Sequence, residues 1–440
     1  MDEIITDLDS ITFILPSFKK LIYTGKKEYL LLFQNNMELR PTGGFIGSVG
    51  FLTVGQGKML NLEIMDVYTI DGQLKGHVEP PHEFRKYFNQ PNWFLRDSNF
   101  DPDFASSAIQ AQWFLDKTLN REFDGVIAIN LFFVQDLLEV VGPVTLADFN
   151  NEVITGDNLF IKAQVFINQK FFAGSSQKKD FLGSLSQELQ KKLTQKDISY
   201  IKLIQVIRKS LEEKNMIFYF KDSELQKEFE NQNWAGRIFT IRCLNMEVLC
   251  LPDYLAVIDA NFGVNKANYF ISKNIIIDKK INLNGQLLTD LTLNYNNQSQ
   301  AGLLQGGQYT NYLRLFLPKN TNFVSASFND QKIEAADFDI SSYQVDKVIY
   351  GILLKIPQTS TGIFKMTYLS SDIFTDKHAF YQFYFQKQPG DKVSNLSLSL
   401  DSSKFTFVPF NFQPRLDGSR TYFHSTDTSV DRLFQLKLIP

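Results

Sequence analysis

The sequence predicts a chain of two parts, in which an α/β region precedes a region built from β-strands alone. With 440 residues the chain is too long for one ordinary domain. Between residues 27 and 264, continuous apolar runs typical of buried strands alternate with segments of helical spacing. From residue 265 to 440, short alternating runs are separated by turn residues at intervals of about ten residues, which favours a β-sandwich.

The α/β region opens with three predicted strands. Residues 27–33 (KEYLLLF) form a continuous apolar run, and residues 45–54 (FIGSVGFLTV) form a second one after a glycine-rich loop. The turn GQGK then leads into a third strand, MLNLEIMDVY, so the second and third strands are expected to form a hairpin. Residues 1–26, which precede the first strand, are predicted to form a helical lead-in.

Helices and two further strands complete the predicted α/β region. Asp103 provides a capping carboxylate before an apolar pattern of helical period. Residues 131–141 read as a helix that the pair Gly142-Pro143 ends. The remaining predictions are helices over 156–172, 178–193 and 198–214 and strands over 123–129 and 216–220. The expected product is a mixed sheet covered by helices.

The C-terminal region is predicted from its alternating runs, which include KINLNGQLLTDLTLNY, YLRLFLP, VIYGILLKI and FYQFYFQ. No clear helix interrupts them. The region is expected to form either one large sandwich or two, split near residue 370, and its strand spacing favours an immunoglobulin-like arrangement.

Composition excludes several classes of protein. The net charge of -3 provides no basic field for nucleic acid, and four histidines with two cysteines leave little room for a zinc site. Cys243 and Cys250 either form a small disulfide loop or stay as two buried thiols, and the thiols are favoured here. No run of 18 apolar residues spans a membrane, and the acidic start is unlike a signal peptide. Taken alone, this indicates the cytoplasm, and an anchor upstream of this chain would reverse that inference.

The densest polar cluster lies between the first two predicted strands, at a sheet end where sites often form. Adjacent glycines let backbone N–H groups converge on an anion, and an arginine adds a bidentate clamp for phosphate or carboxylate. The alternative is a structural turn in which the arginine pairs with a nearby acid. The candidate ligand-binding residues are Asn35, Asn36, Glu38, Arg40, Thr42, Gly43 and Gly44.

A second group of charged residues follows the third strand and precedes the first predicted helix. If the sheet order brings these ends together, carboxylates and arginines share one face, where Mg²⁺ and a pyrophosphate would fit. Asp66 and Asp97 are the candidate metal ligands. The alternative is that Arg96 and Asp97 form a buried ion pair while Asp101 and Asp103 serve a turn and a helix cap.

Long segments resemble a bacterial family catalogued as domain of unknown function 4012. They include YLLLFQNNMELRPTGGFIGSVGFLTVGQGKM, WFLRDSNFDPDFASSAIQAQWF, FDGVIAINLFFVQDLLEVVGPV and, in the sandwich region, YTNYLRLFLPKN. The resemblance implies an extracytoplasmic protein of the cell envelope or cell surface. It also implies membrane association through an N-terminal anchor, which this chain does not contain.

The α/β part also resembles the LytR-CpsA-Psr phosphotransferases, which use Mg²⁺ to move glycopolymers from a polyprenyl-pyrophosphate carrier to the cell wall. In that resemblance Arg40 matches the loop arginine and Asp66 the aspartate ending the third strand, so both are candidate catalytic residues. The partner aspartate of the loop is replaced by Gly43-Gly44, and several further arginines are absent. Arg96, Lys178 or Lys179 would have to replace that positive charge.

Two hypotheses follow. The first is an envelope protein that binds a phosphorylated or anionic glycan-lipid, such as a polyprenyl-phosphate or a cell-wall glycan, and that is a candidate divergent phosphotransferase. The second is a non-catalytic surface, scaffold or adhesion module. A long phenylalanine-rich groove between helices would favour the first hypothesis, and a filled core there would favour the second.

Overall fold

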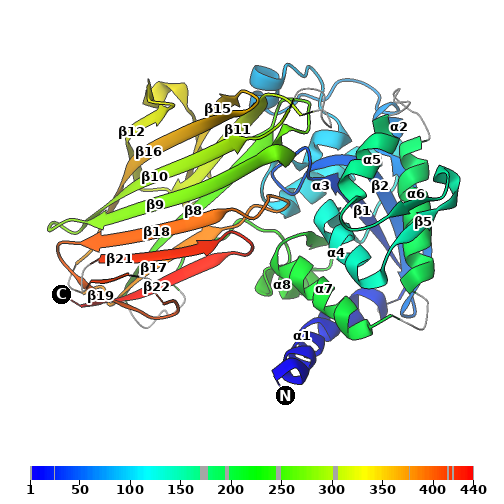
Figure 1. The fold of residues 1–440 in the computed structure, drawn as a ribbon, viewed down its shortest axis with the longest axis horizontal. Coiled ribbons are helices and arrows are strands. Elements are labelled where there is room, and N and C mark those ends of the chain that lie inside the picture. Colours follow the sequence, from blue (N-terminus) through cyan, green and yellow to red (C-terminus); the bar gives the residue numbers. More distant parts are fainter. Residues whose placement is uncertain are drawn as a thin grey trace. The chain divides into compact units, whose positions relative to one another are not determined.

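A computed structural model describes residues 2–23, 25–168, 177–193, 198–243, 249–300, 306–375, 377–413, 416–418 and 421–439. The chain divides into two compact units, Met1–Ile238 and Phe239–Pro440 (Figure 1). Unit 1 combines helices with a mixed sheet, and unit 2 is built from strands, as predicted. Within these described ranges, no helix has the length and apolar composition that crossing a membrane requires.

The sheet of unit 1 has five strands in the order β3-β2-β1-β4-β7. β1 and β4 are parallel, and the other neighbours are antiparallel. The three opening strands, the β2–β3 hairpin and the two later strands are therefore confirmed. Their bounds are β1 Lys27–Asn35, β2 Phe45–Gly55, β3 Lys58–Asp66, β4 Gly125–Asn130 and β7 Met216–Phe220, with a small separate pair formed by β5 Val144–Leu146 and β6 Glu152–Ile154.

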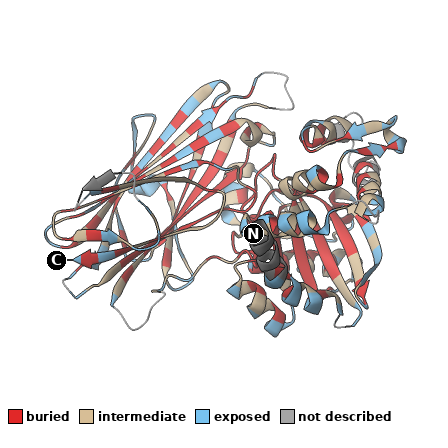
Figure 2. Cartoon of the chain, turned by 60° about the horizontal axis from the view of Figure 1, so that its bottom comes forward, coloured by how far each residue is buried: buried red, intermediate tan, exposed pale blue. Residues whose placement is uncertain are grey.

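Helices cover both faces of this sheet, and the alternation along β1 shows how. Leu30 and Leu32 point into a core with Phe104 of α3, whereas Leu31 points to the opposite face, where α1, α7 and α8 contribute apolar residues. Most of the strand surface is buried (Figure 2). The α-helices are α1 Asp2–Tyr23, α2 Val67–Asp71, α3 Phe104–Leu119, α4 Leu131–Val141, α5 Leu159–Asn168, α6 Gln177–Leu193, α7 Tyr200–Glu212 and α8 Ser223–Asn231.

The predicted helix signals have identifiable partners. The carboxylate of Asp103 accepts hydrogen bonds from the N–H groups of Ala105 and Ser106, as expected for an N-cap. Helix α4 ends at Gly142, whose N–H donates to Leu138 O. The helix expected from residue 156 begins at Leu159, and residues 169–172 of that prediction lie outside the described residues.

Unit 2 contains one β-sandwich with two sheets around a common core. The expected alternative of a split near residue 370 is wrong, because β16 runs through that position and later strands enter both sheets. One sheet has the order β13-β12-β16-β10-β9-β18-β21-β20 and the other β14-β15-β11-β8-β17-β22-β19. The bounds are β8 Cys250–Asn261, β9 Ile271–Ile281, β10 Gln286–Asn297, β11 Tyr309–Pro318, β12 Thr321–Phe328, β13 Gln331–Ile333, β14 Asp339–Tyr343, β15 Lys347–Ile356, β16 Ser360–Ile373, β17 Phe380–Gln386, β18 Asn395–Ser402, β19 Thr406–Pro409, β20 Leu416–Gly418, β21 Thr421–Asp427 and β22 Arg432–Ile439.

Two expectations about the join between the regions are corrected. The boundary expected between residues 264 and 265 lies between Ile238 and Phe239, because β8 pairs with β11 and β17 inside the sandwich. Cys243 and Cys250 form a disulfide with their Cα atoms 6.1 Å apart, so the favoured prediction of two thiols is wrong. This Cα–Cα distance lies within the range that a disulfide spans.

The boundary generates a prediction about fragments. A fragment of residues 239–440 is expected to unfold cooperatively in urea, because it keeps β8 in the middle of its sheet. A fragment of residues 265–440 loses that strand and exposes the edges of β11 and β17, so it is expected to be aggregated or unfolded. Circular dichroism during urea titration distinguishes the two, and a cooperative transition in the shorter fragment would contradict the assignment of β8.

Candidate functional site

The predicted site residues do gather at one edge of the sheet of unit 1. The loop of residues 36–44 leaves β1 at Asn35, and the parallel strand β4 ends at Asn130 beside it. Asp66 ends β3 opposite Ser48 of β2, which places it at the same edge. The sequence prediction of a polar cluster at a sheet end is therefore confirmed in its location.

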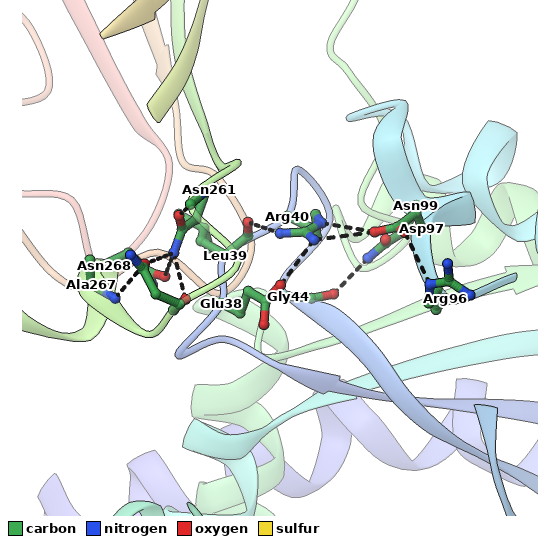
Figure 3. A network of polar contacts seen from close by, with 12 residues as sticks. Glu38, Leu39, Arg40, Gly44, Arg96, Asp97, Asn99, Asn261, Ala267 and Asn268 are labelled. Atoms are coloured by element: carbon green, nitrogen blue, oxygen red, sulfur yellow. Dashed lines mark hydrogen bonds and ion pairs between the residues drawn. The ribbon is translucent and has the colours of Figure 1, made fainter. Parts of the chain in front are cut away.

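Arg40 occupies the centre of this cluster, and its guanidinium is buried (Figure 3). Its Nε and Nη2 atoms each lie 3.2 Å from Asp97 Oδ1, and Nη2 lies 3.1 Å from Glu38 Oε1. The Arg40 side chain is 1% exposed. The phenyl rings of Phe45 and Phe88 lie 5.7 and 5.6 Å from its central carbon. The predicted alternative, in which Arg40 pairs with nearby acids, is confirmed, and the arginine does not face solvent where a ligand would arrive.

Arg96 extends the same network toward the surface. Its Nη1 atom donates to Asp71 Oδ2 at 2.9 Å, and its Nε atom lies 3.6 Å from Asp97 Oδ2. The N–H of Leu95 donates to the other oxygen of Asp71 at 3.0 Å. The ring of Phe94 lies 4.2 Å from the Arg96 guanidinium carbon. Arg96 and Asp97 therefore form the predicted ion pair, and the stronger contact of Arg96 is with Asp71.

Burial and pairing act in opposite directions on the pKa values of this network. Burial alone would lower the pKa of Arg40, but the carboxylates of Asp97 and Glu38 outweigh it and the pKa is raised. Burial raises the pKa of Asp97 against the opposing effect of Arg40 and Arg96. Burial likewise raises the pKa of Asp71 to about 6, although Arg96 opposes the shift. Arg40 therefore stays charged, and Asp71 changes its charge near neutral pH.

The other predicted ligand residues of the loop hold the loop itself together. Asn35 Oδ1 accepts from Met37 N, and Asn36 Oδ1 accepts from Leu131 N at the start of α4. Thr42 Oγ1 accepts from Gln34 Nε2 at 3.1 Å. The contacts of Asn35 and Thr42 are local, whereas that of Asn36 ties the loop to the start of α4; all three are structural, in agreement with the turn alternative.

Gly43 and Gly44 are required by close chain approach. Gly43 has a φ of 137°, and its N–H donates to Arg40 O at 3.0 Å. A Cβ on Gly44 would lie 2.4 Å from the backbone of Asn35, so only glycine fits. The Gly44 carbonyl accepts from Asn99 Nδ2 at 2.8 Å (Figure 3). The glycines thus fold the loop back onto β1, a role that does not require an anion.

The residues expected to bind Mg²⁺ do not fit that ion. Asp97 Oδ1 already accepts from two Arg40 nitrogens, and Asp66 Oδ1 caps α2 by accepting from Tyr68 N at 2.8 Å. Within the described part of the chain, no three His, Cys, Asp or Glu residues are grouped to hold a metal. A carboxylate neutralised by arginines is a poor partner for a divalent cation. Lys179 lies in α6, and its side chain is outside the described residues.

The structure also contains a groove that the sequence did not predict, on the face of the sheet to which Leu31 points. It has a volume of about 860 Å³ and lies between strands β1, β3 and β4 on one side and helix α6 on the other. Its floor includes Leu31, Phe33 and Ile64, and its other walls include Phe149 and Leu189. The amphipathic pattern of α6 was the available signal, but one apolar face cannot reveal whether its partner surface is fully covered.

The polar residues of the groove are acidic or neutral. Glu63 and Asp148 line it together with serine and glutamine side chains, and the described lining contains no lysine or arginine. Asp148 accepts from Ser184 Oγ at 3.0 Å, and Arg121 lies 3.6 Å from Glu63. The lining therefore suits an uncharged apolar ligand better than an anion.

Fold and site together define an α/β unit with a buried charge network and an apolar groove, followed by a β-sandwich unit. Residues 24–166 match the family described as protein of unknown function (DUF4012), which supports the predicted resemblance over those residues. The match covers less than half of the chain. No match was found among curated proteins.

Solved structures give only remote likenesses. Protein gbs0355 from Streptococcus agalactiae is 16% identical with a TM-score of 0.31, covering 48% of this chain and 74% of its own. Lin1025 from Listeria innocua is 13% identical with a TM-score of 0.28, covering 48% and 80%. A transcriptional regulator from Enterococcus faecalis is 10% identical with a TM-score of 0.29, covering 48% and 72%. At these values the likenesses carry no argument about this chain.

The network predicts a large stability loss when Arg40 is removed. Arg40→Ala removes the buried cation shared by Glu38 and Asp97 and leaves Asp97 with the longer contact to Arg96, so the free energy of unfolding is expected to fall by about 3–5 kcal/mol. Arg85→Ala removes an exposed ion pair with Glu79 from the same unit and is expected to change it by less than about 1 kcal/mol. Urea denaturation measures both. Equal stability of the two variants would contradict the structural role of Arg40.

The raised pKa of Asp71 predicts a pH dependence of stability. The folded protein binds this proton with a pKa of about 6, above the ordinary value of 3.8. Because the folded state holds the proton more tightly, stability should fall as pH rises from 3.8 to about 6, by about 3 kcal/mol.

The variant Asp71→Asn should lack this part of the pH dependence, whatever its absolute stability. Asp116→Asn, which changes a half-exposed carboxylate on α3, should keep the slope of the unchanged protein. Urea unfolding at several pH values across this window measures the slopes. The same slope in Asp71→Asn and the unchanged protein would contradict the role of Asp71.

Proposed function

We propose that this chain is a cell-envelope protein whose α/β unit binds the apolar chain of a phosphorylated glycan-lipid, such as a polyprenyl-phosphate-linked glycan. The groove between α6 and the sheet is the observation that supports this proposal. Its volume of about 860 Å³ falls in the range that small-molecule sites occupy, roughly 300–1,000 Å³. The sequence prediction named a long phenylalanine-rich groove between helices as the feature that would favour ligand binding. The observed groove lies between a helix and strands, and the phenylalanines of its described lining are Phe33 and Phe149.

The chemistry of the groove supports an apolar ligand. Leucine, isoleucine and phenylalanine side chains from three strands form its base, and burying a chain of CH₂ groups contributes about 0.8 kcal/mol per group. Because the described lining holds acids and no basic residue, the charged head group of such a ligand would remain outside. This assigns the lipid part to the groove and leaves the glycan in solvent.

An envelope location is part of the proposal and has two sources of support. The Cys243–Cys250 disulfide is of the kind that persists in oxidising compartments outside the cytoplasm. Residues 24–166 match the family described as protein of unknown function (DUF4012), and both the envelope location and the membrane anchor are carried over from the sequence resemblance to that family. The finer resemblances, of unit 1 to LytR-CpsA-Psr phosphotransferases and of unit 2 to an immunoglobulin-like sandwich, belong to the same proposal.

Phosphoryl transfer with Mg²⁺ is the weaker part of the predicted function. Arg40 is buried against two carboxylates, and Asp97 is occupied by arginine. A cation clamp for a pyrophosphate needs positive charge that is not already neutralised. The second candidate function, a scaffold without catalysis, is favoured by this same network, and it would retain the sandwich for spacing or adhesion.

Filling the groove tests the binding proposal. Gly183 of α6 lines the groove, and a Cβ at this position meets nothing within 4 Å, so Gly183→Phe adds a ring at the groove wall from a position with room for its first carbon. Lys191→Phe places the same ring on an exposed position of the same helix. With undecaprenyl phosphate in detergent, we expect Gly183→Phe to weaken binding at least tenfold, about 1.4 kcal/mol, and Lys191→Phe to leave it unchanged.

The control experiments separate the two candidates. Absence of binding by the unchanged protein would leave only the scaffold candidate. Equal binding by both variants would place the ligand elsewhere than in the groove. Binding is expected to persist when a chelator removes divalent cations. Mg²⁺-dependent hydrolysis of a polyprenyl pyrophosphate would instead support the phosphotransferase function.

A further inference from the structure

The core of the sandwich contains a buried lysine, aspartate and asparagine around one carboxylate. Lys273 Nζ donates to Asp259 Oδ2 at 2.8 Å, and Asn311 Nδ2 donates to Asp259 Oδ1 at 2.6 Å. The side chains of Lys273 and Asp259 are 4% and 2% exposed, and Asn311 has no exposed surface. Asp259 therefore bridges a primary amine and a carboxamide in a region shielded from water.

These three residues come from both sheets. Asp259 on β8 and Asn311 on β11 lie on adjacent strands of the seven-stranded sheet, whereas Lys273 lies on β9 of the eight-stranded sheet (Figure 1). Lys273 is in phase with the core residues Ile271 and Ile275, so its side chain crosses the interior between the sheets. A bond between Lys273 and Asn311 would join the two sheets covalently.

The carboxamide of Asn311 is oriented as an electrophile requires. Its Oδ1 accepts from the backbone N–H of Ala260 at 3.1 Å, which would stabilise negative charge developing on that oxygen. Its Nδ2, the leaving group, already contacts the Asp259 carboxylate. Tyr295 donates from its hydroxyl to the same carboxylate oxygen at 2.9 Å and holds it in place.

We propose that Lys273 and Asn311 form an intramolecular isopeptide bond, with Asp259 moving the protons. Asp259 takes a proton from the Lys273 ammonium, and the neutral amine attacks Cγ of Asn311. A new Nζ–Cγ bond forms, Asp259 passes the proton to Nδ2 as the Cγ–Nδ2 bond breaks, and Asp259 then takes the second proton that Nζ loses and remains protonated. The products are a secondary amide and one ammonia. Nothing is oxidised or reduced, and no further reactant is needed.

Burial and pairing act in opposite directions on the Lys273 amine. An ammonium is not a nucleophile; burial alone would lower its pKa, but the carboxylates of Asp259 and Asp391 outweigh burial and raise it. The amine therefore becomes a nucleophile only as its proton passes to the contacting carboxylate of Asp259. Exclusion of water also disfavours hydrolysis of the carboxamide. Asp391 lies 2.5 Å from the Lys273 amine and is a second acceptor for its proton. Because the fold already holds both groups at the same carboxylate, the reaction avoids the entropy loss of bringing two separate reactants together.

A second buried lysine on the same strand provides a natural comparison. Lys279 Nζ lies 2.7 Å from Asp253 Oδ2 and 3.0 Å from Thr289 Oγ1, and Tyr381 donates to the same aspartate. The aspartate, the lysine and a tyrosine are thus repeated, but Asp253 Oδ1 accepts from the backbone N–H of Tyr254, where Asp259 Oδ1 accepts from the Asn311 carboxamide. This second cluster should form no crosslink.

Intact mass spectrometry of the purified full chain under denaturing conditions tests the proposal. The expected mass is below the sequence mass by one ammonia in addition to the disulfide's two hydrogens. Tandem spectra of a proteolytic digest should show the peptides holding Lys273 and Asn311 joined. Lys273→Met, Asn311→Ala and Asp259→Ala should each abolish the joined pair, whereas Lys279→Met should retain it.

The digest also decides between sources of the same mass loss. A succinimide at Asn284-Gly285 would lose one ammonia as well, but it leaves the two peptides separate. A full sequence mass in the unchanged protein, or ammonia loss without the joined peptides, would overturn the proposal. Joined peptides that carry Lys273 and Asp391 after loss of one water would overturn the choice of Asn311. Because the unchanged protein gives the decisive result, the outcome does not depend on whether a variant folds.

Discussion

The free-energy cost of burying an unpaired charge governs the polar parts of this structure. Arg40 is the clearest case, because its guanidinium is buried beside Phe45 and Phe88 and is neutralised by Glu38 and Asp97. The contact with Asp97 ties the loop of residues 36–44 to a segment 57 residues later in the chain. Gly43, Gly44, the asparagine side chains of the loop and the Arg96–Asp71 pair lie around Arg40. The polar contacts at this end of the sheet therefore stabilise the fold itself.

The same constraint operates in the sandwich with a different chemical consequence. Lys273 and Lys279 both lie in a β-core and each requires an aspartate from the facing sheet. Around Asp253 the remaining partners are the Tyr381 hydroxyl and the backbone N–H of Tyr254, so that cluster contains no side-chain amide beside its ion pair. Around Asp259 the partners include a carboxamide, so the carboxylate that pairs with the lysine amine also accepts from the side-chain amide of Asn311. The groove of unit 1 differs from both clusters. Apolar surface remains accessible there between α6 and the sheet, and no buried charge in it needs a partner.

Much of the secondary structure was predictable because its signals are local. The apolar run of residues 27–33, the Asp103 cap and the Gly142 stop each act through neighbours in sequence, and each element appears where expected. The polar loop at the end of β1 was also placed correctly, because a loop between two buried strands must lie at a sheet edge. Of the two carboxylates that pair with Arg40, Glu38 is close in sequence and could be named from the loop itself. Asp97 becomes a neighbour only when η2 (Leu95–Phe100) packs beside the sheet.

The sequence by itself determined the succession of strands and helices, the two-part architecture and the polar edge of the sheet. Only the tertiary structure decided which sheet receives β8, because an apolar strand carries no record of its partner and pairing with β11 and β17 is a long-range choice. It also decided that Arg40 is enclosed, that α6 leaves a groove, and that Asp259 meets Lys273 and Asn311. Each of these depends on packing between segments far apart in the chain, and local propensity does not encode such distances.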